Sequence, residues 1–383
     1  MTAPAVFTAR ETAAVMVVGV IGVLIPGLQP QLLGALLAEA KLSTGALGLL
    51  ATAELLAMGI AAGTAGLLLP VNRLPTVAAT ALIGVAALDL ATPHVSEGGL
   101  FAARIAAGFG EGVLIWIAIG LIVRAQRPER WSGIYLALQT LAQLALATAL
   151  GLKIVPLFGS AGGFLLLALV TALGLVALPW LPRAYAVLDH GEAAGGGLPV
   201  RGLVALCGVT LCLAFIVSVW VYVEPLGLQR GIDAATVHLI APLSLAMQVA
   251  GAAAAAALAG RLPAKAVVTL VTLVNLGLLA IMAAPPSTAA FLVATSMFGF
   301  LWLFAMPFQV PILIDADPRR RAAMLIGGAQ LTGSSLGPFA ASFLVGEQDV
   351  GPVLWFGAAC AVTGLLTLIG PVIGQGKAQE KPN

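Results

Sequence analysis

Charged side chains are scarce in this sequence. Only 9% of the 383 residues are Asp, Glu, Lys or Arg, whereas a soluble domain carries roughly 25%. So few charges cannot cover a water-facing surface of ordinary size, and most of the outer surface must therefore face lipid. The sequence also shows no basic stripe and no aromatic platform, so we expect no nucleic-acid partner.

Cysteine and histidine are equally rare. The three cysteines, Cys207, Cys212 and Cys360, fall in apolar stretches, and an odd number at such positions predicts buried thiols without a disulfide framework. The three histidines are scattered and no H-E-x-x-H motif occurs, so we expect no metal and no other cofactor. A membrane enzyme would need a nucleophile–base pair or a metal cluster at one interface, and we therefore expect no enzyme.

Long apolar runs take up most of the chain. The mean hydropathy is +1.07, and about 20 apolar residues suffice for a helix to cross a bilayer. The sequence therefore predicts an all-α integral membrane protein with twelve transmembrane helices, arranged as two pseudo-symmetric six-helix bundles. The expected helices cover residues 12–36, 44–70, 74–92, 98–123, 131–152, 160–182, 202–224, 234–258, 265–284, 288–314, 322–345 and 351–373.

One connection is much longer than the others. Residues 183–201 carry mixed charge and three consecutive glycines, a composition typical of a linker. We expect this segment to be a cytoplasmic linker between an N-terminal bundle of residues 1–182 and a C-terminal bundle of residues 202–383.

The two predicted bundles share sequence landmarks. Arg-Leu-Pro occurs at 73–75 and again at 261–263, and proline begins a charged turn at Pro128 and at Pro318. The offsets of 188 and 190 positions are nearly equal. Such a repeat is typical of transporters that hold their substrate near the midplane, between two similar halves.

The cations favour one side of the predicted membrane. With both termini on the cytoplasmic side, 14 of the 18 Lys and Arg residues lie on that side. Lys41 and Arg230 lie on the opposite side, and Arg104 and Lys153 lie at helix depth. A bias of this kind in short loops sets orientation. We predict a multi-pass protein of the bacterial inner membrane with both termini in the cytoplasm.

The fourth predicted helix carries a recognisable motif. Residues 104–112 read RIAAGFGEG, which is similar to the arginine-plus-glycines motif of the major facilitator superfamily. Residues 66–73 read GLLLPVNR and resemble that family's glycine–aspartate–arginine loop, although the aspartate is missing. The resemblance covers nearly the whole chain and implies a secondary transporter. It also implies that Arg104 matches the motif arginine associated with proton coupling.

Three ionisable residues lie deep in predicted helices. Each such group costs roughly 2.5–3.5 kcal/mol on insertion scales, so it needs a partner or a function. Arg104 and Glu111 are seven residues apart on one helix, on nearly the same face and about 10 Å apart along the axis. We expect Glu111 to face a cavity or a cation. Glu54 has no cation within reach on its own helix and could bind and release a proton. We predict proton coupling by Glu111, Arg104 and Glu54, with salt-bridge or packing roles as the alternative.

Polar and aromatic side chains at helix depth are the candidates for substrate contact. Buried amides and hydroxyls need hydrogen-bond partners, and a substrate can be one. Hydrogen bonds between helices are the alternative for each of them. The candidates are Gln29, Tyr135, Gln139, Gln143, Glu224, Gln248, Phe298, Trp302 and Gln330.

These features favour a transporter over the other classes of membrane protein. We expect a proton-coupled secondary active transporter with alternating access, which carries a small, largely apolar or amphipathic organic compound. Its partners would be that substrate, protons and the lipid bilayer, and it would act as a monomer. An uptake symporter that binds organic anions through Arg104 is the alternative, and a non-transporting membrane sensor is a more remote one.

Overall fold

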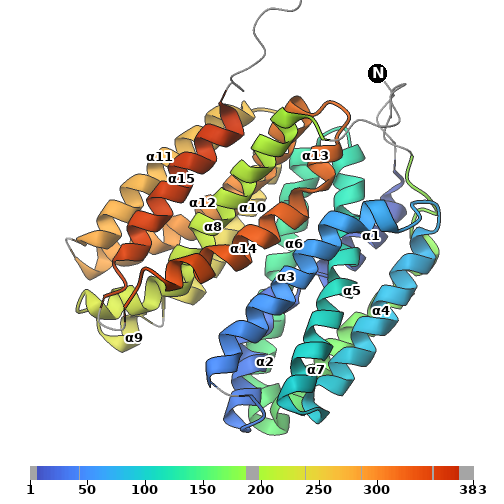
Figure 1. Cartoon of the computed structure of the whole chain (residues 1–383), viewed down its shortest axis with the longest axis horizontal. Helices are drawn as coiled ribbons and strands as arrows, with labels where there is room; N and C mark the ends of the chain where they lie inside the picture. The colour runs from blue at the N-terminus through green and yellow to red at the C-terminus, as the bar shows by residue number, and fades with distance from the viewer. Residues whose placement is uncertain are drawn as a thin grey trace, which may run out of the picture.

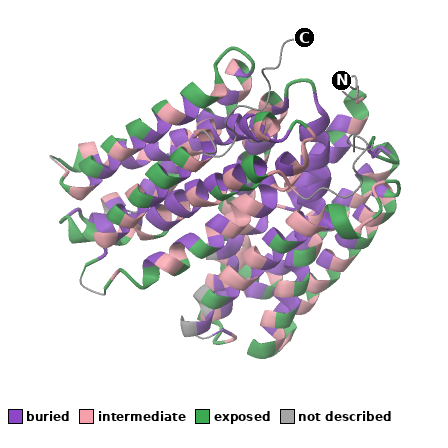
Figure 2. Cartoon of the chain, turned by 45° about the horizontal axis from the view of Figure 1, so that its top comes forward, coloured by how far each residue is buried: buried purple, intermediate pink, exposed green. Residues whose placement is uncertain are grey.

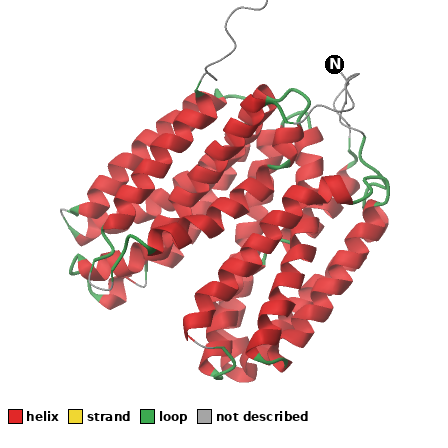
Figure 3. Ribbon diagram, viewed as in Figure 1, coloured by secondary structure: helices red, strands yellow, loops and turns green. Residues whose placement is uncertain are grey.

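The molecule is built from helices. The computed structural model describes residues 7–42, 44–186, 198–237, 239–285, 287–346 and 349–370, and within these ranges it has no strand (Figure 3). The α-helices are α1 (Ala9–Ile21), α2 (Ile25–Ala38), α3 (Thr44–Leu68), α4 (Leu74–Ala91), α5 (Glu97–Arg124), α6 (Pro128–Ala149), α7 (Val155–Leu173), α8 (Val200–Gln229), α9 (Ala234–Val237), α10 (Ile240–Leu258), α11 (Ala264–Ala283), α12 (Thr288–Ala316), α13 (Arg321–Met324), α14 (Ile326–Ser342) and α15 (Pro352–Ile369). Shorter turns are η1 (Thr92–His94), η2 (Leu150–Ile154) and η3 (Gly174–Trp180).

Ten helical segments of the described chain are long and apolar enough to cross a membrane. One of them, Pro128–Trp180, has 53 residues and would be about 80 Å long as one helix, against a hydrocarbon core of about 30 Å. The chain reverses within it at Gly159, whose φ of 63° interrupts the helix, so this segment makes two crossings. The eleventh predicted helix is present as α13 and the 17-residue α14. The prediction of an all-α multi-pass membrane protein is confirmed.

The helices form two groups (Figure 1), α1–α7 and α8–α15. The start of α1 and the end of α15 lie at the same end of the molecule, which we call the terminus-bearing end. The predicted linker 183–201 lies largely outside the described residues, and the predicted domain boundaries stay a prediction.

The two groups contact each other at the terminus-bearing end. The Arg320 guanidinium donates a hydrogen bond to the Val123 carbonyl, and Arg124 Nη1 approaches the Met324 sulfur at 3.5 Å. Nearby, α3 and α14 approach through glycines, because a Cβ added to Gly328 would lie 2.9 Å from the Cα of Gly63. The ribbons of the two groups diverge toward the other end (Figure 1).

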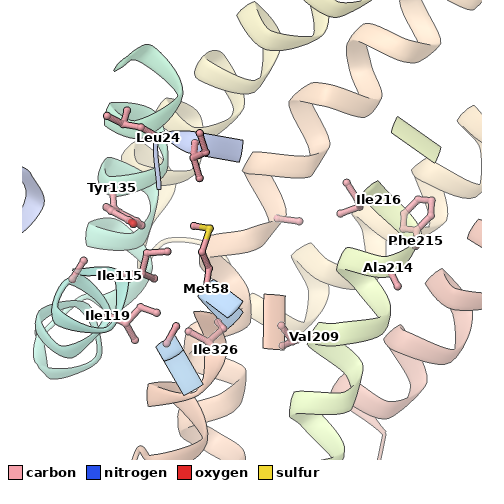
Figure 4. Close-up of a cluster of buried hydrophobic side chains, with 14 of the residues drawn as sticks. Leu24, Met58, Ile115, Ile119, Tyr135, Val209, Ala214, Phe215, Ile216 and Ile326 are labelled. Atoms are coloured by element: carbon pink, nitrogen blue, oxygen red, sulfur yellow. The ribbon is translucent and has the colours of Figure 1, made fainter. Parts of the chain in front are cut away.

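Burial follows the expectation for a protein in lipid. Exposed residues lie mainly on the outer sides of the helices (Figure 2), and large apolar side chains such as Leu67, Leu152 and Trp355 are among them. Buried apolar side chains fill the interior, where Met58 of α3, Ile115 of α5 and Ile326 of α14 belong to one cluster (Figure 4). The apolar outer surface supports a lipid-facing exterior.

Candidate functional site

A buried ion cluster lies inside the first group of helices. The guanidinium of Arg104, on α5, donates from Nε to Glu54 Oε1 of α3 at 2.8 Å, and its Nη2 bonds the same oxygen. Its Nη1 donates to Asp89 Oδ1 of α4 at 2.6 Å. Its Nη2 also lies 3.3 Å from Oε1 of Glu111, which follows Arg104 by seven residues on α5. One cation thus joins three carboxyl groups from three helices.

Two further helices enclose this ion cluster. From α2, Gln29 Nε2 donates to Glu54 Oε2 at 3.0 Å. From α7, the ring of Phe164 lies 5.5 Å from the centre of the Arg104 guanidinium, a distance at which the ring face attracts a cation. The side chains of Arg104 and Glu54 are fully buried, and that of Glu111 is 4% exposed. Glu111 is therefore the one member of the ion cluster whose side chain is not fully buried.

The glycines of the 104–112 motif explain how these groups meet. A Cβ on Gly108 would lie 2.6 Å from the carbonyl oxygen of Glu54 on α3, and a Cβ on Gly110 would lie 2.5 Å from Val85 on α4. Side chains at these positions would hold both neighbouring helices away from α5. The small residues therefore allow the close approach that places Glu54 and Asp89 within reach of Arg104.

The structure changes two of the sequence interpretations. Glu54 is not a lone carboxylate, because Arg104 of another helix bonds it twice. All three nitrogens of the Arg104 guanidinium are bonded to carboxyl oxygens, and the side chain is buried. Arg104 is therefore not available to an anionic substrate in this conformation, which weakens the organic-anion alternative.

Asp89 was missed by sequence reasoning. It lies near the end of α4, where a carboxylate normally reaches the water-exposed headgroup layer. Its partner Arg104 lies 15 residues further on, across the α4–α5 connection. The sequence does hold a signal for this pair, because Asp89 lies near the end of α4 and Arg104 lies two turns into α5. Whether the two side chains meet depends on how these antiparallel helices are aligned, which the sequence does not give.

Three of the predicted substrate residues are bonded within the protein. Gln29 bonds Glu54, Tyr135 donates its hydroxyl to the Gly19 carbonyl at 3.0 Å, and Gln143 Nε2 donates to the Val23 carbonyl at 2.6 Å. The Gln143 contact lies at the break between α1 and α2, where backbone carbonyls lose their helical partners. These side chains hold α2 and α6 in place around the break.

Other candidates gather on α10 and α12 of the second group. Gln248 Nε2 and Trp302 Nε1 are buried donors with no hydrogen-bond partner among the described residues. The Trp302 ring meets the Trp220 ring of α8 edge-on, with centroids 6.1 Å apart. It also packs on an apolar cluster that includes Leu136 of α6 and Leu213 of α8. Trp302 thus lies between the two groups of helices.

The remaining candidates are more dispersed. Phe298 is buried, with its ring 5.6 Å from that of Phe215. Gln330 of α14 donates to Gln309 of α12 at 3.2 Å, a residue that the sequence interpretation did not single out. Gln139 and Glu224 are half-buried. Trp302 and Gln248 thus lie on α12 and α10, two helices that contact each other, whereas Gln139 lies on α6 and Glu224 on α8.

Comparison with known proteins gives matches at the level of structure alone. No protein-family model and no curated protein matches the sequence. The crystal structure of the major facilitator superfamily transporter FucP in the outward conformation aligns with a TM-score of 0.75 and 14% identity, over 94% of this chain and 97% of that one. A variant of the Escherichia coli fucose:proton symporter FucP aligns with a TM-score of 0.74 and 13% identity, over 94% of this chain and 97% of that one. The proton:xylose symporter XylE bound to 6-bromo-6-deoxy-D-glucose aligns with a TM-score of 0.70 and 16% identity, over 93% of each chain.

At these identities the likeness concerns the fold. It extends over nearly the full length of both partners, and it agrees with the motif resemblance of residues 104–112. This chain therefore has the fold of the major facilitator superfamily transporters.

Proposed function

We propose that the protein is a proton-coupled secondary active transporter for a small organic compound, with Glu111 as its main proton carrier. The observation that carries the proposal is the buried ion cluster of Arg104, Glu54, Asp89 and Glu111. Ionisable groups inside a membrane protein are costly and commonly mark proton pathways. The chain's fold is shared with proteins described as proton symporters, which supports the same mechanism here.

Glu111 is the member of the ion cluster best suited to exchange a proton. Its contact with Arg104, at 3.3 Å, is longer than those of Glu54 and Asp89. Its second oxygen, Oε2, has no partner among the described residues, and its side chain is slightly exposed. When Glu111 binds a proton, Glu54 and Asp89 still surround the guanidinium, so one carboxyl can change charge without dismantling the site.

The contacts between the two groups of helices support an outward-facing state. They lie at the terminus-bearing end, which the cation bias assigns to the cytoplasm. The α3–α14 and α5–α13 contacts would close the inner side, while the groups diverge toward the outer side (Figure 1). FucP, which aligns with this chain, is described in an outward conformation. Alternating access would then require these inner contacts to separate while outer ones form.

The substrate that we propose is small and amphipathic. Trp302 and Trp220 provide an apolar aromatic wall. The donors Trp302 Nε1 and Gln248 Nε2, which have no partner in the described part of the chain, would be satisfied by acceptor oxygens on the ligand. A compound with one apolar face and hydroxyl, ether or carbonyl oxygens fits this combination. The sugars named for FucP and XylE have these properties, so sugars belong in the class to be tested.

The experiment is accumulation by the purified protein in proteoliposomes with an imposed pH gradient. A panel of labelled fucose, xylose, uncharged amphipathic compounds and organic anions would be offered in turn. We expect an uncharged member to accumulate, and a protonophore to abolish the accumulation. Trp302→Ala should weaken the apparent affinity, whereas Trp355→Ala, on the exposed surface, should not. Accumulation that survives the protonophore would contradict proton coupling, and a preference for anions would favour the alternative function.

A further inference from the structure

The ion cluster holds more acidic groups than its cation can balance. Three carboxyl groups surround a single guanidinium. If all three were ionised, two negative charges would remain uncompensated at a fully buried site. A buried charge without a partner is strongly destabilising, by several kcal/mol. The ion cluster must therefore bind protons or another cation in the folded protein.

The hydrogen bonds distinguish the three carboxyl groups. Both oxygens of Glu54 accept hydrogen bonds, Oε1 from Arg104 and Oε2 from Gln29. By contrast, Asp89 Oδ2 and Glu111 Oε2 are buried and have no partner among the described residues. Burial removes the hydration of an ionised oxygen, and without a donor no hydrogen bond compensates for that cost. The desolvation cost of a protonated oxygen is much smaller.

We infer that Asp89 is a second proton-binding site, and that Asp89 Oδ2 and Glu111 Oε2 both carry protons in this conformation. Glu54 is then the one ionised partner of Arg104, and the ion cluster is neutral. Among the described residues, Arg104 contacts both carboxyls and also bonds Glu54. The neutral amide of Gln29 from α2 donates to Glu54, and the ring of Phe164 from α7 lies against Arg104.

The two protons have different roles. Glu111 is the slightly exposed member, so its proton exchanges during transport. The Asp89 side chain is fully buried and retains its proton, which keeps the ion cluster from carrying a second excess negative charge when Glu111 is deprotonated. The inference rests on the proposed function only in its treatment of Glu111, because the charge count at Asp89 holds whether or not the protein transports anything.

Infrared spectroscopy tests the inference directly. The purified protein would be labelled with ¹³C-aspartate and measured in lipid nanodiscs at neutral pH. We expect the C=O band of a protonated aspartic acid, shifted by the label and lost in Asp89→Asn. The same band should persist in Asp317→Asn, because Asp317 is buried but accepts backbone hydrogen bonds from Arg319 and Ala322, as an ionised carboxylate does.

Stability supplies a second readout. Asn at position 89 resembles a protonated aspartic acid and keeps an oxygen for Arg104, so Asp89→Asn should melt close to the wild-type temperature. Glu54→Gln removes the ionised partner and should melt much lower. No label-shifted band, or equal losses in the two variants, would overturn the inference. A melting temperature that rises with Na⁺, together with a missing band, would also overturn it and identify a sodium ion as the balancing charge.

The two proposals fail separately. If Glu111→Gln retained proton-driven accumulation, the proposed coupling role would be wrong, and the aspartic acid band of Asp89 would still be expected. If the band were absent, the protonation of Asp89 would be wrong, and the loss of accumulation in Glu111→Gln would still be expected.

Discussion

The two halves of the molecule share one scaffold but differ in charge. In the first half, Gly108 of α5 lies against the Glu54 carbonyl of α3, and Arg104 bonds the Glu54 carboxylate. In the second half, Gly299 of α12 lies against the Ser244 carbonyl of α10, where an added Cβ would be 2.7 Å away. These positions differ from those of the first half by 190 or 191 residues.

At the equivalent of the ion pair, the second half has a neutral hydrogen bond. Ser244 Oγ donates to the Thr295 carbonyl at 3.0 Å, where the first half pairs Glu54 with Arg104. The same crossing of helices is therefore built without any ionisable side chain. Since the fold does not require the ion pair, its presence in one half favours a functional role for it.

The outer ends of the two halves repeat this contrast. Glu39, after α2, accepts a hydrogen bond from the Ser160 backbone at 2.5 Å. The residues 190 positions later make the same contact with a neutral group, because Gln229 accepts from the Val350 backbone at 3.0 Å. Twice, then, a carboxylate of the first half corresponds to an uncharged side chain of the second.

The largest expected effect comes from removal of the guanidinium. Arg104→Gln leaves Glu54 ionised and unpaired in the interior, which should destabilise the protein by about 3–5 kcal/mol. At the equivalent position, Thr295→Ala should cost about 1 kcal/mol or less, because the Ser244 bond is made to the Thr295 backbone. Thermal unfolding in nanodiscs measures both. Equal losses would contradict the distinction between the two halves.

A smaller and symmetric effect is expected at the helix crossings. Gly108→Ala and Gly299→Ala should each destabilise by about 1–3 kcal/mol, since both force a side chain against the backbone of the neighbouring helix. The same thermal unfolding experiment compares them. Gly84→Ala on α4, which has open space around it, serves as the control and should be neutral or slightly stabilising. A loss in only one half would break the proposed structural equivalence.

The smallest effect concerns pH. Burial acts to raise the pKa of Glu39, but hydrogen bonds from Lys41 and Ser160 outweigh it and hold the pKa at about 2, below its usual 4.5. A carboxylate with a lowered pKa stabilises the folded state above pH 4.5, and this contribution is lost as the pH falls toward 2. Glu39 is partly exposed, so the contribution should be about 1 kcal/mol or less.

Glu39→Gln gives the first half the neutral side chain of the second. Unfolding free energies measured from pH 5 down to pH 2.5 should then fall less steeply in the variant than in the wild type. Gln229→Ala should leave the pH slope unchanged, because it removes no titrating group. Identical slopes in the wild type and Glu39→Gln would show that the Glu39 contact does not contribute.

Periodicity and hydropathy predicted most of the fold and part of the site. Helical spacing correctly placed Arg104 and Glu111 on one face, because both belong to the same helix. It could not identify Asp89 or the partner of Glu54, since those contacts depend on how α3 and α4 align with α5. The sequence likewise identified Tyr135 and Gln143 as polar side chains at helix depth but could not show that both bond carbonyls of the α1–α2 segment.

The central claim is that proton binding at Glu111 drives transport. Its most direct test compares Glu111→Gln with Glu129→Gln, a half-buried glutamate outside the ion cluster, in proteoliposomes containing a substrate found by the panel. Accumulation under a pH gradient and exchange between compartments of equal pH would be measured for each. We predict that Glu111→Gln abolishes accumulation and retains most of the exchange, while Glu129→Gln keeps both. Full gradient-driven accumulation by Glu111→Gln would contradict the claim.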